Sequence, residues 1–290
     1  MTLGQKLGKF TINTLIRIFL CLLCLTVVYP LFWNLMSSFK SNQEFFANPW
    51  ALPHDLILSG SIAGIFENYV RVWSITGLSV PFMNSLYVSV ISLVAGIVLN
   101  CMSAYACTRL GLKAGKILSS FYLFMMFVPG GISLTSSFLN LRDLGLIDTR
   151  AAIIWCNVSG SAIGTGFILR NFFTTLPHEL EEAAYIDGAG IMRTFWQIML
   201  PLAKPGIATV GIFNFLGYWG EYTLSSVVIF DQKKIPLSVA LFTLQATTQH
   251  MADWAALFAG MVIVLIPIMI IYLSFQQYIV SGMTAGAIKG

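Results

Sequence analysis

Residues 177–205 read PHELEEAAYIDGAGIMRTFWQIMLPLAKP, a polar stretch between two long apolar runs. A connection between antiparallel helices usually takes about 2 to 8 residues. The charged connection here extends from Arg170 to Pro205, so it is too long to be a simple turn. Its pattern instead predicts two short helices joined by a tight reversal.

The first short helix is predicted from Glu179 to Asp187. Pro177 stands at a plausible first-turn position, and the glutamates that follow lie near the positive end of the helix dipole. Gly188 and Gly190 then permit left-handed backbone, which a sharp reversal requires.

The second short helix is predicted to place Ile191, Phe195 and Ile198 on one face and to stop at Pro201. Such a helical hairpin can fit a groove on another protein and pass force between subunits. The alternative is an amphipathic hairpin that only caps the bundle at the membrane surface. An acidic cluster disfavours that alternative, because anionic lipid of the inner leaflet repels acids.

The composition explains the apolar runs on either side. Of the 290 residues, 57% are hydrophobic and only 10% are charged, against about 25% charged residues in ordinary globular chains. A bilayer span needs about 20 apolar residues. Six segments qualify: Ile18 to Ser37, Phe82 to Cys107, Ile117 to Asn140, Ala151 to Leu169, Gly206 to Phe230 and Trp254 to Gln276. The sequence therefore predicts an all-α membrane protein with six transmembrane helices.

The first apolar segment follows Lys6, Lys9 and Arg17, as a cleaved signal peptide would. It is longer than a signal core of about 7 to 15 residues, and residues 29–33 offer no small-residue cleavage site. We expect it to be retained as the first span.

Lysine and arginine positions set the predicted orientation. With the N-terminus inside, ten of these residues fall in inner segments and six in outer segments, so both termini are predicted to be cytoplasmic. The net charge of +4 follows from this bias and predicts no nucleic-acid partner. The predicted divisions are residues 1–72 (N-terminal segment, first helix and outer loop), 73–277 (transmembrane domain) and 278–290 (cytoplasmic tail).

Catalytic and metal sites are not predicted. The five cysteines lie in or at the ends of predicted spans, where they read as packing residues and imply no disulfides. His54, His178 and His250 are far apart, and residues 111–117 lack the spacing of a phosphate-binding loop. An intramembrane enzyme would need a convergent acid, base or metal set that the spans do not supply.

The hairpin stretch resembles the EAA motif of ABC importer permeases. The resemblance rests on Glu182-Ala183-Ala184, Asp187-Gly188-Ala189, Phe195, Ile198, Leu200-Pro201-Leu202 and Pro205. In that family the stretch spans residues 174–205 here and forms a coupling helix that docks into a cleft of an ATPase subunit. The resemblance implies five ATPase-facing positions: Glu182, Ala183, Ala184, Asp187 and Gly188.

Further segments resemble the maltose-type carbohydrate permeases of that family. They are Asn84-Ser85-Leu86, Ala104-Tyr105-Ala106 with Arg109, and residues 282–290. The resemblance implies a type I importer fold in a bacterial or archaeal cell membrane and an oligosaccharide as substrate. It also implies four kinds of partner: a second homologous permease, two ATPase subunits, an extracytoplasmic solute-binding protein and the lipid bilayer. ATP and magnesium would bind the ATPase, with no cofactor on this chain.

Glu221 is the acid that the sequence places inside a predicted span, and such an acid is a functional candidate by default. Asn214, Tyr218, Trp219 and Tyr222 surround it with aromatic and hydrogen-bonding groups suited to a sugar pathway. The family often has Trp-Asn-acid here, whereas this chain has Trp219-Gly220-Glu221. The alternative, left open, puts Glu221 in a helix break near the outer mouth, neutralised by a neighbouring subunit.

A self-sufficient secondary transporter or channel is the competing hypothesis. It would need ionisable relays in several spans, and the predicted spans contain Glu221 alone. Pro129-Gly130-Gly131 and Pro267 interrupt helical hydrogen bonding and would act as hinges for alternating access or as simple kinks.

Overall fold

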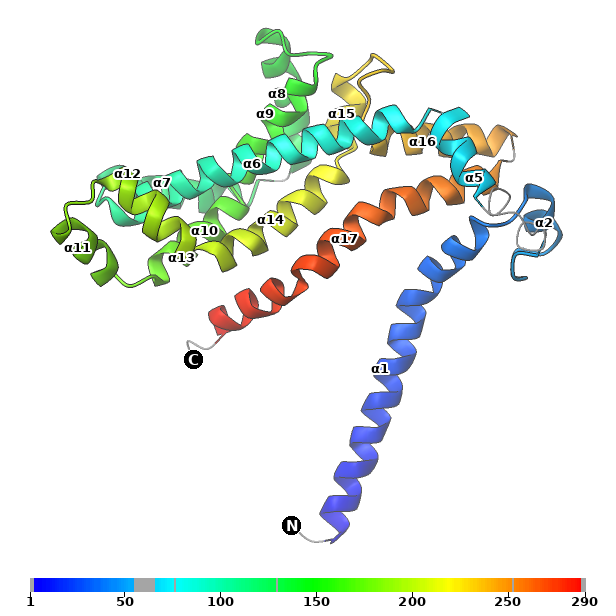
Figure 1. The fold of residues 1–290 in the computed structure, drawn as a ribbon, viewed down its shortest axis with the longest axis horizontal. Helices are drawn as coiled ribbons and strands as arrows, with labels where there is room; N and C mark the ends of the chain where they lie inside the picture. Colours follow the sequence, from blue (N-terminus) through cyan, green and yellow to red (C-terminus); the bar gives the residue numbers. More distant parts are fainter. Residues whose placement is uncertain (1–2, 55–65, 76, 129, 252, 288–290) are drawn as a thin grey trace. The chain divides into compact units, whose positions relative to one another are not determined.

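The computed structural model describes residues 3–54, 66–75, 77–128, 130–251 and 253–287, and Figure 1 shows a chain built from helices. No strand occurs among these residues, so the all-α prediction is confirmed. The elements are α1 (Leu3–Ser37), α2 (Asn42–Ala47), α5 (Glu67–Val70), the π-helical turn η1 (Arg71–Ile75), α6 (Ser79–Arg109), α7 (Lys113–Met125), α8 (Gly130–Asp143), α9 (Arg150–Ser161), α10 (Thr165–Thr175), α11 (Glu179–Ile186), α12 (Ile191–Thr194), the π-helical turn η2 (Phe195–Met199), α13 (Leu200–Leu202), α14 (Lys204–Trp219), α15 (Thr223–Val228), α16 (Leu237–Met251) and α17 (Trp254–Ala287).

The chain forms two compact units, one made of residues 1–77 and 243–265 and the other of residues 78–242 and 266–290. In the first unit, Asp253 accepts hydrogen bonds from Asn42 and Arg71, both at 2.9 Å. Lys40 is buried, and its ammonium donates to the carbonyl of Pro49 at 2.8 Å. These contacts give the predicted outer loop a folded structure over its described residues.

Helix α6 is the centre of the second unit, where it contacts α7, α9, α10 and α14. Small residues on its buried face, including Ser89, Ser92 and Gly96, allow neighbouring helices to approach closely. A Cβ atom at Gly96 would stand 3.2 Å from the Ser161 hydroxyl and 3.3 Å from the Tyr218 hydroxyl. The sequence pattern of small residues therefore marks helix packing.

Among the described residues, three helical stretches are long and apolar enough to cross a membrane: Ile12–Ser37, Ser79–Arg109 and Trp254–Gln277. Two bent pairs also pass this test, α9 with α10 (bent by 43°) and the helix through Ile191–Leu202 with α14 (bent by 75°), which gives up to five spans. The predicted third span corresponds to two helices, α7, which ends at Met125, and α8, which begins at Gly130. The count of six and the side of each terminus stay predictions.

Two predicted helix limits are wrong. Helix α10 continues to Thr175, so the polar connection begins after it and not at Arg170. The predicted fifth span, Gly206 to Phe230, is not continuous, because α14 ends at Trp219 and α15 begins at Thr223. The second short helix contains a π-helical turn and ends at Leu202, one residue after the predicted stop at Pro201.

The other predicted interruptions have different outcomes. Pro267 lies inside α17, which continues through it. Neighbouring helices and local adjustments make such a proline tolerable in a transmembrane helix. Pro129 lies outside the described residues, but α7 ends before it and α8 begins at Gly130, so a break in the predicted third span is confirmed.

Candidate functional site

The predicted hairpin is present as α11, a reversal and the helix that starts at α12. Asp187 caps α11, Gly188 follows with φ +76°, and two hydrogen bonds close the end. The N–H of Gly188 donates to the carbonyl of Tyr185 at 3.0 Å, and that of Ala189 to Ala184 at 2.8 Å. These are the two bonds of a Schellman motif, so the left-handed glycine fixes the direction of the chain after the helix.

Two details of this hairpin were predicted wrongly. Gly190 has φ −75° and serves as the N-cap of α12, so only Gly188 uses left-handed backbone. Pro177 precedes the N-cap residue His178 and lies outside the helix. Of the three residues predicted to share a face of the second helix, Phe195 is buried, Ile198 is partly buried and Ile191 is 46% exposed, while Met199 is also buried.

Helix α11 has an outward and an inward face. Four of the five predicted ATPase-facing residues are exposed: Glu182, Ala183, Asp187 and Gly188. Ala184 is 4% exposed, so in this structure it lies on the inward face of α11 and not on the face open to a partner. Sequence reasoning missed Ile186, which at 86% exposed is the most prominent apolar side chain on the outward face.

The inward face of α11 is tied to the end of α6. Glu181, which is 7% exposed, places a carboxylate oxygen 3.4 Å from the guanidinium of Arg109. The ring of Tyr105, one turn earlier on α6, lies 5.3 Å from that of Phe195. Sequence reasoning gave Glu181 only the helix-dipole role that it shares with its neighbours, although Glu181 and Ala184 are three residues apart and therefore share one helix face.

The predicted pathway residues on α14 are held inside the chain. Asn214 is buried, and its carbonyl oxygen accepts a hydrogen bond of 2.9 Å from the Thr165 hydroxyl. The hydroxyl of Tyr218 donates to the carbonyl of Asn157 at 3.1 Å. Trp219 is 1% exposed and stacks on Phe215, with 5.6 Å between ring centroids. Its ring therefore offers no surface to a substrate in this structure.

Glu221 lies in the break between α14 and α15, which agrees with the helix break of the alternative left open and not with a position within a continuous span. Its carboxylate accepts the N–H groups of Leu224 at 2.7 Å and Ser225 at 3.0 Å, and also the Ser225 hydroxyl. The acid therefore caps the N-terminal end of α15, where a negative charge is favourable. Tyr222, the fifth predicted residue, packs its ring 4.9 Å from that of Phe242.

A groove of about 730 Å³ lies between α6, α7 and α9. Its walls are mostly apolar, with the rings of Tyr122 and Trp155 and polar groups from Asn100, Ser103 and Ser159. None of the five predicted pathway residues lines it, and sequence patterns gave no signal for it because its residues come from three separate helices.

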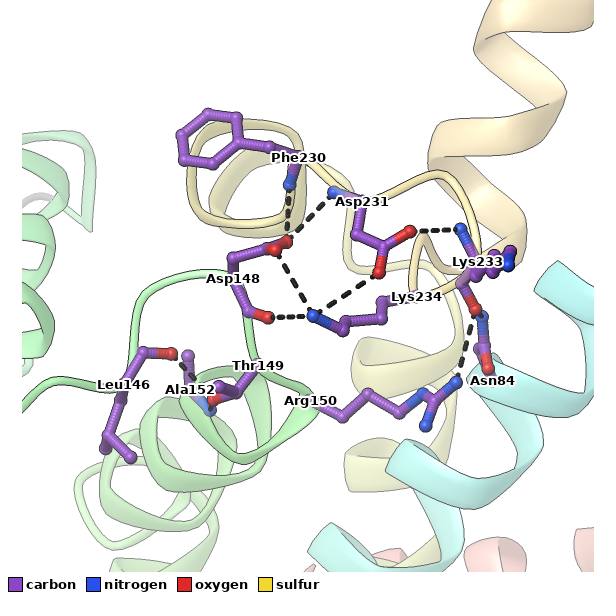
Figure 2. A network of polar contacts seen from close by, with 10 residues as sticks. All are labelled: Asn84, Leu146, Asp148, Thr149, Arg150, Ala152, Phe230, Asp231, Lys233 and Lys234. Atoms are coloured by element: carbon purple, nitrogen blue, oxygen red, sulfur yellow. Dashed lines mark hydrogen bonds and ion pairs between the residues drawn. The ribbon is translucent and has the colours of Figure 1, made fainter.

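Asp148, Asp231 and Lys234 form a polar network between the α8–α9 and α15–α16 connections, and Figure 2 shows its bonds. A carboxylate oxygen of Asp148 accepts the N–H groups of Asp231 and Phe230, both at 2.9 Å. These two donors and the Lys234 ammonium, 3.2 Å from the second oxygen, hold the pKa of the Asp148 carboxyl below its ordinary value. The hydrogen bonds from Lys234 to the carboxylates of Asp148 and Asp231 raise the pKa of Lys234.

The N-terminal part of α6, at the end of the helix away from Arg109, is hydrogen-bonded to residues next to this network. The amide of Asn84 donates to the carbonyl groups of Lys233 and Ile235, both at 2.9 Å (Figure 2 includes the Lys233 contact). The hydroxyl of Ser85 accepts the N–H of Leu237 at 2.8 Å. Helix α6 is therefore bonded at one end to the α15–α16 connection and at the other to α11.

The model of the family described as binding-protein-dependent transport system inner membrane component matches residues 56–285. That range includes α6, the hairpin of α11 and α12, and the groove. The chain belongs to this family. It is an inner membrane component of an ABC importer with several apolar helices, and the alternative of a secondary transporter or channel is not favoured.

Relatives of this permease have similar sequences over nearly its whole length. The diacetylchitobiose uptake system permease protein NgcG of Streptomyces coelicolor is 35% identical over 91% of this chain and 84% of that protein. The maltodextrin transport system permease protein MalD of Streptococcus pneumoniae is 28% identical over 98% of each chain. The permease family that the EAA motif indicated is thus confirmed.

The fold of this permease matches a chain of a bacterial ABC transporter that imports the acidic polysaccharide alginate. The TM-score is 0.77 at 24% identity, over 96% of this chain and 98% of that one. A chain of the alginate transporter in complex with its alginate pentasaccharide-bound periplasmic protein matches with a TM-score of 0.59 at 14% identity, over 93% of this chain and 94% of that one. The predicted importer-permease fold is confirmed by this structural similarity.

Proposed function

We propose that this permease forms half of the translocation pathway for an oligosaccharide and that α11 docks into a separate ATPase subunit. The main support for this docking is the exposed, outward face of α11. It presents Glu182, Ala183, Ile186 and Asp187 on a helix whose end is fixed by a Schellman turn. A rigidly held helix of this kind suits the insertion of a helix into a protein groove.

The proposal includes the remaining partners of such a transporter. A second homologous permease completes the pathway, and an extracytoplasmic solute-binding protein delivers the substrate. The alginate transporter complexed with a periplasmic protein supports the delivery step. Two ATPase subunits bind ATP and magnesium, while this chain binds neither and catalyses no reaction.

Two observations support a carbohydrate. The relatives named above handle diacetylchitobiose and maltodextrin. The groove beside α6 combines aromatic rings, which suit the C–H faces of a sugar, with amide and hydroxyl groups that can bond its hydroxyls. The substrate is therefore proposed to be an oligosaccharide of neutral or amino sugars.

Uptake by the purified complex tests this function. A tag on this chain recovers the complex from its own membrane, and proteoliposomes containing it receive labelled diacetylchitobiose or maltotriose with the solute-binding protein. We expect sugar uptake only when ATP is supplied on the side of the membrane where the ATPase subunits lie. Uptake by this chain alone under an ion gradient, or no binding of either sugar by the complex, would contradict it.

A further inference from the structure

Arg109, the last residue of α6, has a side chain that is 1% exposed and joins three helices. Its Nε donates to the carbonyl of Phe173 at 3.0 Å, and its Nη2 donates to the carbonyls of Phe173 and Leu176. Those carbonyls close the C-terminal end of α10, where helix carbonyls lack partners and a positive charge is favourable. The remaining nitrogen, Nη1, faces Glu181 of α11.

Little else holds α11 itself against the bundle. Of its eight residues, Glu181 and Ala184 are the buried ones. Ala184 contributes only a methyl group, whereas the carboxylate of Glu181 is bonded to the guanidinium of Arg109. A buried pair of charged groups is directional and costly to break. The Arg109–Glu181 pair therefore resists displacement of α11 more than the single methyl group of Ala184 does.

The bonds of Glu181 and the docking face of α11 are on opposite sides of the helix. Glu182 and Ile186 are exposed, while the neighbouring Glu181 is covered. The network of Arg109, Glu181 and the α10 carbonyls, which we call the Arg109 clamp, can therefore fail without removing the surface that the ATPase would bind.

We infer that Arg109 and Glu181 are positioning residues that convert movement of α11 into movement of α6 and α10. This inference rests on the proposed function. Breaking the clamp uncouples ATP hydrolysis from transport and leaves ATPase docking intact. A residue that only stabilised the fold would instead lower assembly, hydrolysis and transport together.

The test uses the whole transporter complex in proteoliposomes with the variant Glu181→Gln, which keeps the size of the side chain and removes its charge. Glu179→Gln is the matched control, because Glu179 is exposed on the same helix. Glu181→Asp keeps the charge and serves as the conservative variant. Three quantities are measured: ATPase recovered with the permease, ATP hydrolysis, and sugar taken up per ATP hydrolysed.

Glu181→Gln is expected to retain the ATPase and hydrolyse ATP while sugar moved per ATP falls by about tenfold, the scale of a lost charge-assisted hydrogen bond. Glu181→Asp should recover part of the ratio, and Glu179→Gln should equal wild type. An unchanged ratio in Glu181→Gln overturns the inference, and so does loss of the ATPase, which would make Glu181 a docking residue or a residue that only stabilises the fold. If the wild-type complex shows no ATP-driven sugar uptake, the proposed function fails instead.

Discussion

Replacing Gly188 by serine tests the reversal that orients the docking helix. Gly188 has φ +76° and Gly190 has φ −75°, and a Cβ atom at either glycine would meet no heavy atom within 4 Å. A side chain therefore fits at both positions, and the backbone conformation alone distinguishes them. The same substitution at Gly190 is a matched control, because serine is also a favoured N-cap residue.

The expected cost at Gly188 is about 1–2 kcal/mol, the penalty that a residue with a Cβ atom has in left-handed backbone. A shift of that size lowers the population of the native turn relative to alternative conformations by about 5- to 30-fold. Because only the native turn presents α11 for docking, the apparent affinity for the ATPase falls in proportion to the fraction of native turn, by at most this factor. Gly188→Asn should lose less, since asparagine tolerates this conformation.

Titration of the purified ATPase onto the permease in lipid nanodiscs measures the effect. The dissociation constant should rise for Gly188→Ser and stay near wild type for Gly190→Ser. Equal binding by Gly188→Ser and wild type, or equal weakening at both glycines, would refute the argument from backbone strain.

Three other changes have defined outcomes in thermal unfolding of the detergent-solubilised protein. Trp219→Ala should destabilise the chain by about 3–5 kcal/mol because the ring is fully buried; a loss below about 1 kcal/mol would argue against that burial. Glu221→Ala should cost about 1 kcal/mol as a lost helix cap, and a loss of sugar uptake without any loss of stability would favour a pathway role instead. Asp148→Asn should be less stable than wild type at neutral pH. Because the folded pKa of Asp148 lies below the ordinary value of 3.8, the stability difference should persist as the pH falls to about 3.8 and disappear as the pH falls further, through the folded pKa. A difference that increased toward acid pH would contradict this.

The sequence predicted those features that depend on local pattern. Apolar runs gave the long helices, and the acids followed by Gly188 gave a short helix with a reversal at its end. The exposed position of Glu182 and Asp187 agrees with the motif. These succeed because hydrophobic length, dipole preference and left-handed backbone are properties of neighbouring residues.

Features set by distant contacts were not predictable. Arg109 and Glu181 are 72 residues apart, and Lys234 and Asp148 are 86 apart, so no local pattern pairs them. The sequence left two positions open for Glu221, within a span or in a helix break, because no proline marks the break after Trp219 and the capping of α15 by Glu221 is seen only in the structure. The inward position of Ala184 follows from the pairing of Glu181, which lies on the same face.

Photo-crosslinking at Ile186 tests the central claim, that the outward face of α11 docks into an ATPase. Benzoylphenylalanine replaces Ile186, which is 86% exposed on α11, and in a control chain replaces Phe230, which is 62% exposed beside the Asp148 network. After illumination of the intact complex, the account predicts a product that joins position 186 to the ATP-binding subunit and no such product from position 230. Absence of the product at 186, or equal yields at both positions, would contradict it.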